Sequence, residues 1–232
     1  MKIFIIMFAL CVYFSGMVYG QDNRSKTADP FTIALDGGMT LSKLSNEGFN
    51  ILGDLYGGME LSYMPGAELE YAITPAVRVR SGVKYVRLGG KSEETVQTDT
   101  EGRELNRIRI VNKQSNIEIP LLLKYVFTGD WYQPYIESGA TIGFLTSASL
   151  VADGTLNGET LTIDEDISDV LKDTAVGLNF SVGVQIPLRA ALGLDIGGTY
   201  NLGLTNQLDA ADEDRSQKVR SWRFELGLFL GI

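Results

Sequence analysis

The sequence predicts an all-β protein: an eight-stranded antiparallel transmembrane β-barrel of the outer-membrane type, following a cleaved N-terminal signal peptide. Three observations predict it. Eight segments alternate large apolar residues with small or polar ones, the connections between them alternate in length, and the first 20 residues have the layout of a secretory signal. We therefore expect residues 1–20 to be removed and residues 21–232 to form one barrel domain.

The amino-terminal stretch MKIFIIMFALCVYFSGMVYG has one Lys, an apolar run from Ile3 to Phe14 and small residues ending at Gly20. An uncleaved membrane anchor is the alternative, because residues 3–19 approach the about 20 residues that span a bilayer as a helix. The signal layout favours cleavage after Gly20. Cys11, the only cysteine, leaves with the signal, so the mature chain has no disulfide or thiolate metal site.

The segment SNIEIPLLLKYVF, residues 115–127, shows the alternation that defines a strand with two different faces. Its odd-numbered residues from Ile117 to Phe127 are all apolar, whereas the even-numbered set includes Glu118 and Lys124. A half-buried strand of a soluble sandwich gives the same pattern, so this segment alone leaves both folds open. Pro120 cannot donate a ladder hydrogen bond, and we expect a bulge there.

The other seven segments favour the barrel; they cover residues 31–41, 63–73, 77–88, 135–145, 174–186, 192–204 and 222–232. Short connections lie near residues 74–75, 128–133 and 188–190, and long ones cover residues 44–61, 89–114, 147–173 and 206–217. This rhythm is typical of outer-membrane barrels. Glycines recur opposite the apolar face, where a narrow barrel interior needs small residues and a water-facing strand seldom has them.

The alternation also assigns charged residues to the inside of the barrel. A buried charge is tolerated only when it is partnered, so we predict a paired, charged plug in the lumen. We expect Glu118 to pair with Arg78, Arg80 or Lys84, and Lys124 to pair with Glu137. The predicted plug consists of seven acids and five bases: Asp36, Glu68, Glu70, Glu118, Glu137, Asp195 and Glu225 with Arg78, Arg80, Lys84, Lys124 and Arg223.

Composition argues against several classes of function. Loss of the signal removes only Lys2 among charged residues, leaving 19 basic against 29 acidic residues and a net charge of −10. Such a balance opposes nucleic acid or an anionic membrane surface as a partner. The chain has no histidine, hence no His-dependent base or triad, and we expect neither an enzyme nor a cofactor.

One acidic run could hold a metal ion. DEDISD, residues 164–169, offers the oxygen ligands that Ca²⁺ prefers. It lacks the Asp-x-Asp-x-Asp-Gly spacing of a calcium loop, and an acidic run is usually a solvated loop face. We therefore predict no metal site.

Two stretches resemble a known family. EIPLLLKY at Glu118 to Tyr125 and the Pro-Tyr and Gly-rich strand at Pro134 to Gly143 resemble the PorT-like, "porin family" outer-membrane β-barrels of Bacteroidetes-type bacteria. Gly-rich strands near residues 177–203 and the apolar final strand are also similar, so the resemblance covers the whole mature chain. It implies a small barrel in the outer membrane, with relatives implicated in secretion or gliding machinery.

The expected function is therefore a non-enzymatic outer-membrane barrel with a structural or interaction role in the envelope, either alone or as part of a secretion or gliding-type assembly. Its expected partners are outer-membrane lipid, the barrel-assembly machinery and envelope proteins. The alternative is a narrow channel for small solutes or ions. The strand count opposes a channel, because water-filled pores belong to barrels of about 16 to 18 strands.

Overall fold

The computed structural model describes residues 30–47, 58–92, 95–98, 104–129, 131–156, 159–188, 191–208 and 216–232. The expected signal peptide lies outside the described residues. The only helix in the described part of the chain is a short 3-10 turn, η1 (Ser168–Val170), so no described helix could cross a membrane. The strands are β1 (Phe31–Glu47), β2 (Gly58–Ala72), β3 (Val77–Lys91), β4 (Thr95–Thr98), β5 (Glu104–Val126), β6 (Gln133–Leu156), β7 (Glu159–Asp166), β8 (Thr174–Pro187), β9 (Leu192–Gly203) and β10 (Ser216–Gly231).

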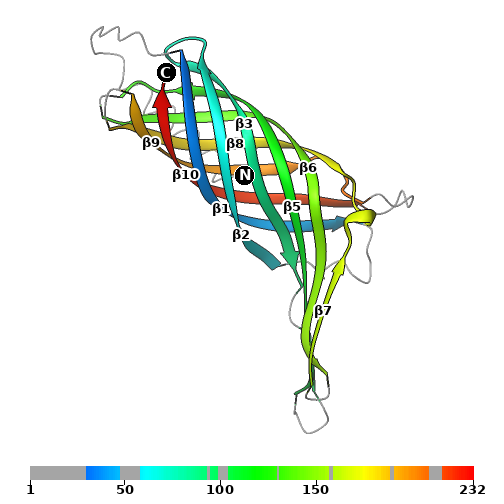
Figure 1. The fold of residues 1–232 in the computed structure, drawn as a ribbon. Helices are drawn as coiled ribbons and strands as arrows, with labels where there is room; N and C mark the ends of the chain where they lie inside the picture. The colour runs from blue at the N-terminus through cyan, green and yellow to red at the C-terminus, as the bar shows by residue number, and fades with distance from the viewer. Residues whose placement is uncertain are drawn as a thin grey trace.

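Eight strands close into a barrel. β1, β2, β3, β5, β6, β8, β9 and β10 each pair antiparallel with the next, and β10 pairs with β1 from Thr32↔Gly231 to Glu47↔Ser216 (Figure 1). Closure removes the sheet edges that would otherwise need partners. The predicted eight-stranded antiparallel barrel is confirmed.

The outer face of the barrel is apolar. Leu35, Leu121 and Leu226 are 66%, 62% and 58% exposed, which an exterior in contact with lipid explains. The apolar set from Ile117 on β5 to Phe127, the residue after β5, extends about 33 Å, at about 3.3 Å per residue. A strand tilt of about 45° reduces this to about 24 Å along the membrane normal, close to the about 25 Å of a lipid-facing band.

Aromatic pairs mark both borders of this band. Near the short turns, Phe31 packs on Tyr71 with ring centroids 5.0 Å apart. Near the long connections, Tyr200 packs on Trp222 at 4.8 Å. Aromatic girdles at these two levels are typical of barrels in membranes, where amphipathic rings lie at the interface.

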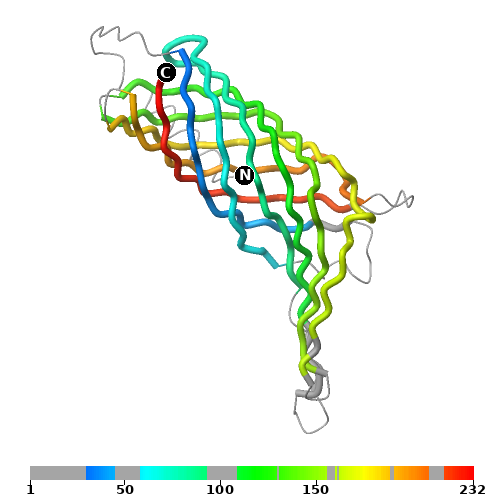
Figure 2. The backbone as a smooth tube through the Cα atoms, in the orientation of Figure 1, coloured from blue at the N-terminus to red at the C-terminus, as the bar shows by residue number. Residues whose placement is uncertain are grey.

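β5 and β6 continue far beyond the lipid-facing band. There β4 pairs with β5 and β7 pairs with β6, which gives a four-stranded extension pointing away from the barrel (Figures 1 and 2). We call β4, β7, residues 104–113 of β5 and residues 149–156 of β6 the blade. The expectation that residues 89–114 and 147–173 are long loops was wrong for most of their length. Apolar alternation in the blade is confined to short runs, RIRI at residues 107–110 and TLTID at residues 160–164, whereas the segments that identified the other strands are at least 11 residues long.

A bulge separates the barrel part of β6 from its blade part. Ser115 pairs with Ser147 while Asn116 pairs with Leu145, which leaves Thr146 as the extra residue. The Thr146 hydroxyl donates to the Ser115 carbonyl at 2.8 Å.

The bulge expected at Pro120 was wrong. The β3–β5 register is the same on both sides of Pro120, at Ser81↔Leu121 and Lys84↔Glu118. Instead, the Pro120 carbonyl accepts a hydrogen bond from the Ser81 hydroxyl at 2.8 Å. The ladder therefore passes the proline without a change of register.

Candidate functional site: the filled lumen

Two bases, Arg80 and Lys124, occupy the half of the lumen nearer the short turns. Arg80 contacts Asp195 at 2.7 Å, Glu68 at 3.1 Å and Glu70 at 3.4 Å. The Lys124 ammonium, which is fully buried, lies 2.9 Å from Glu70 and 3.3 Å from Asp195. Two cations thus share two carboxylates, so each charge in this half has more than one partner.

Arg78 and Lys84 extend the network in both directions. Arg78 contacts Glu70 at 2.6 Å. The Lys84 ammonium is surrounded by Glu225 at 2.6 Å, Glu68 at 3.0 Å and Asp36 at 3.3 Å, which come from three different strands. Because Glu68 also contacts Arg80, the two halves of the lumen are connected.

Glu118 does not pair as expected. Both oxygens of its carboxylate accept hydrogen bonds from Arg223, at 2.6 and 2.9 Å, and both side chains are buried. The predicted partners Arg78, Arg80 and Lys84 were therefore wrong. Arg223 lies on β10, which is not adjacent to β5, so this pair crosses the lumen. Lys84 is directly opposite Glu118 in the register, yet it binds acids on β1, β2 and β10.

Lys124 also differs from its expected pairing. Glu137 is its register neighbour on β6, but the Glu137 carboxylate lies 3.6 Å from Arg80 instead. The prediction failed because the partner of a lumen side chain is set by reach across the interior, while the alternation specifies only its face. All twelve predicted lumen residues nevertheless take part in these ion pairs.

Sequence reasoning missed Tyr135 and Gln185 in the same network. The Tyr135 hydroxyl donates to Asp195 at 2.6 Å, and the Lys124 ammonium lies 3.9 Å from the centre of the Tyr135 ring. The Gln185 amide also donates to Asp195, at 3.0 Å. Tyr135 stands two residues before the inward Glu137, so the same alternation could have found it.

Above the charged network, toward the long connections, the lumen is filled by neutral side chains. First come hydrogen-bonded amides and hydroxyls: Asn201 donates to Asn179, which donates to Thr141. An apolar cluster follows, with every member at most 5% exposed: Leu44, Met64, Val86, Leu88 and Val219. The expectation that the inward face is small or polar was wrong at this end.

Two hydroxyl groups bind backbone carbonyls of β3 beside the apolar cluster, where the β2–β3 ladder is interrupted. The β2–β3 register shifts between Met59 and Gly66, which interrupts the ladder on that side of β3. From β1, Thr40 donates to the Arg87 carbonyl at 2.7 Å and Ser42 donates to the Gly89 carbonyl at 2.9 Å. Side chains inside the barrel thus satisfy backbone groups that a neighbouring strand would otherwise bind.

Two small spaces lie within this packing. One cavity of about 10 Å³ lies among Lys84, Glu118 and Arg223, and another of about 30 Å³ lies beside Thr141 and Asn201. One water needs about 10 to 15 Å³. The first space therefore has room for about one water and the second for about two.

The acidic run at residues 164–169 lies on β7 and η1, outside the barrel. The Ser168 backbone N–H donates to Asp166 at 2.9 Å, and hydrogen bonds from Ser168 hold the pKa of the Asp166 carboxyl below its usual range. Among the residues that the structure describes, no three acidic side chains are grouped to hold a metal ion.

Comparison with known proteins identifies the family. Residues 19–209 match the model of the outer membrane protein beta-barrel domain. No curated protein matches the sequence. Similar solved structures include Neisserial surface protein A from Neisseria, at 17% identity and a TM-score of 0.48, covering 88% of this chain and 99% of that one. They also include OprG from Pseudomonas aeruginosa, at 14% identity and a TM-score of 0.45, covering 88% and 96%.

The family match covers most of the sequence, and the barrel is closed. The chain belongs to the outer membrane protein beta-barrel domain family, and it is a protein of the outer membrane.

Proposed function

We propose that this chain is a non-enzymatic barrel with a closed lumen, which anchors the blade in the outer membrane and presents it to an envelope partner. The observation that carries the proposal is the contrast between a filled interior and a four-stranded sheet that projects beyond the lipid-facing band. The PorT-like resemblance of residues 118–125 and 134–143 supports a secretion or gliding-type assembly as the setting.

The filled lumen favours a barrel that anchors the blade over a channel for solutes or ions. Ions would have to cross a layer of paired charges and then a packed region in which buried amides lie beside the apolar cluster. The interior of an eight-stranded barrel is narrow enough for side chains to fill it in this way. The pairing of the buried carboxylates and the lack of histidine support a role without catalysis.

The blade supports interaction with a protein. Within the described residues, β4 and β7 each pair with one neighbouring strand, so the other edge of each offers backbone groups to an added strand. The β7 side is acidic, with Asp164, Glu165 and Asp166 exposed, which favours a basic partner segment. Long connections of outer-membrane barrels face the outside of the cell, so the partner would meet the blade there.

Planar-bilayer recording of the purified mature chain tests closure. We expect no steady current above the baseline of the lipid. A matched variant, Met64→Gly with Val86→Gly, removes apolar side chains from the cluster. A current through this variant would show that the barrel inserts into the bilayer under the same conditions. A steady open current in the parent would contradict the proposal and favour the narrow channel.

A trimmed variant tests the role of the blade. Lys91 pairs with Val111, and Leu150 pairs with Glu165, so a two-residue Asn-Gly turn can join each pair and remove the strands beyond. We expect this variant to fold in membranes and to lose the envelope complexes that the parent forms on cross-linking. If the trimmed variant retains the same complexes, the blade is not the interaction site.

A further inference from the structure

Three basic residues gather on the outer face of the barrel, at the long-connection border of the lipid-facing band. Lys43 and Arg220 are direct register partners on β1 and β10, and Lys218 is the next outward residue on β10. Lys43 and Arg220 are exposed. We call Lys43, Lys218 and Arg220 the basic cluster.

The facing pair Lys43 and Arg220 is electrostatically unfavourable. Like charges directly opposite on neighbouring strands repel each other. No acid lies directly opposite Lys43 or Arg220, because they face each other, Arg220 pairs with Leu202 on β9, and the next outward pair toward the band is Leu41↔Trp222. The nearest outward register position with an acid is Glu47↔Ser216, beyond Lys218. Among the residues described, no acid forms an ion pair with a member of the cluster. An anion from outside would relieve this repulsion.

The position of the cluster indicates which anion. Trp222, two residues from Arg220, packs on Tyr200 at the aromatic border of the band. The cluster therefore lies at the level where lipid headgroups begin. Phosphate groups at this level would meet the three cations directly.

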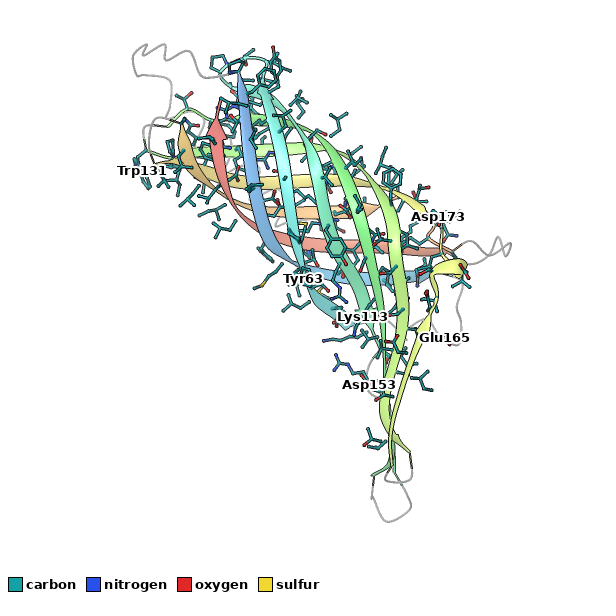
Figure 3. The ribbon with its side chains drawn as sticks, viewed as in Figure 1. Tyr63, Lys113, Trp131, Asp153, Glu165 and Asp173 are labelled. Atoms are coloured by element: carbon teal, nitrogen blue, oxygen red, sulfur yellow. The ribbon has the colours of Figure 1, made fainter. Side chains whose placement is uncertain are left out.

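A second pair of cations lies in the same sector of the barrel. Arg87 stands two residues beyond Tyr85 on β3 and stacks on the Tyr63 ring, 5.4 Å from its centre. Lys113 follows on β5 at the base of the blade, between Tyr63 and Asp153 in Figure 3.

Among the residues whose exposure the structure describes, the charges at this end are segregated. The exposed acids in that part of the chain lie on β6, β7, η1 and the segment before β8: Asp153, Asp164, Glu165, Asp166, Asp169 and Asp173. At the short-turn end, the described part of the chain has no outward Lys or Arg. Despite the net charge of −10, the described residues thus include a basic sector at the level of the leaflet around the long connections.

We propose that the basic cluster is a binding site for the phosphate groups of membrane lipids in the leaflet that surrounds the long-connection end of the barrel. Lys43 and Arg220 bind one phosphate between them, and Lys218 adds a third cation. The ligand class is a phosphorylated lipid, and its acyl chains would lie along the apolar surface below Leu41 and Trp222.

The test measures lipid retained by the mature chain. The parent, Lys43→Gln/Arg220→Gln and the control Arg109→Gln/Lys172→Gln are reconstituted in phosphatidylcholine vesicles containing bis-phosphorylated lipid A. The barrels are then extracted in mild detergent, and bound lipid A is counted by native mass spectrometry. The control removes the same charge from exposed positions outside the cluster, and a heat-dependent shift on a gel verifies folding of each barrel.

We expect the cluster variant to retain about 10- to 30-fold less lipid A than the parent, since each interfacial Lys or Arg adds to the attraction for anionic headgroups. The control should match the parent, and retention should fall as NaCl is raised. Lipid A with its phosphates removed should be retained no better than phosphatidylcholine. Equal retention by the cluster variant and the control would overturn the proposal, as would tight binding of the phosphate-free lipid.

Discussion

Arg223 and Glu118 form a bidentate pair across the lumen, with both groups buried. Removing one partner leaves an uncompensated charge in a low-dielectric interior, whereas removing both does not. We expect Glu118→Leu to lower the free energy of unfolding by about 3 to 5 kcal/mol. The double variant Glu118→Leu/Arg223→Leu should recover most of that loss. Urea unfolding in lipid vesicles, followed by tryptophan fluorescence, measures both; equal losses in the two variants would show that Arg223 finds another partner.

Tyr135 gives a second prediction at a single residue. Tyr135→Phe keeps the ring beneath Lys124 but removes the hydrogen bond to Asp195. A hydrogen bond to a charged group contributes about 1.5 to 3 kcal/mol, so we expect a loss of unfolding free energy in that range. Tyr71→Phe, whose ring lies on the lipid-facing surface against Phe31, is the matched control and should change little. A loss as large in the control would indicate a general effect of tyrosine hydroxyls.

At the scale of the strand, the two faces of β5 differ most at Leu121. Leu121→Arg places a cation near the middle of the lipid-facing band, at a cost of about 2 to 4 kcal/mol. Ile163→Arg is matched, because Ile163 is also an exposed apolar residue but lies on β7 in the blade. We expect a reduced folding yield in lipid vesicles for the first variant only. Equal yields would mean that the lipid-facing band has been assigned to the wrong face.

How far the elements could be predicted depends on their surroundings. A strand between lipid and a polar lumen has two contrasting faces, so residues 117–127 already specified which side each residue takes. The blade has no lipid-facing side, and its alternating runs, such as residues 107–110, are too short to identify strands of this length. The apolar cluster was missed for a different reason. Met64 and Val86 share the even-numbered inward frame of Glu68 and Lys84, but the inward face was expected to carry only small or polar residues. Partners such as Arg223 for Glu118 lie on non-adjacent strands, and no local pattern encodes them.

For the whole molecule, burial of the ion-pair network predicts weak salt dependence. The charges of Arg80, Lys84 and Lys124 lie inside the barrel, where dissolved ions screen little. We expect the urea midpoint in neutral-lipid vesicles to change little as NaCl rises from about 0.05 to about 1 M, over which the screening length falls from above 10 Å to about 3 Å. A steep fall in the midpoint would mean that water and salt enter the lumen.

Thr146 separates two alternation frames within one strand. Below it, even-numbered residues of β6 such as Ile136 and Ile142 face lipid; above it, the even-numbered Ala148 is buried on the opposite side. Because side chains alternate with a period of two, one extra residue exchanges the faces of everything that follows. The inward and outward positions of β6 therefore follow one frame in the barrel and the other frame in the blade. A different extension could be grafted onto this barrel without rewriting the lipid-facing strands, provided that the junction lies beyond Ser147 and the extra residue stays.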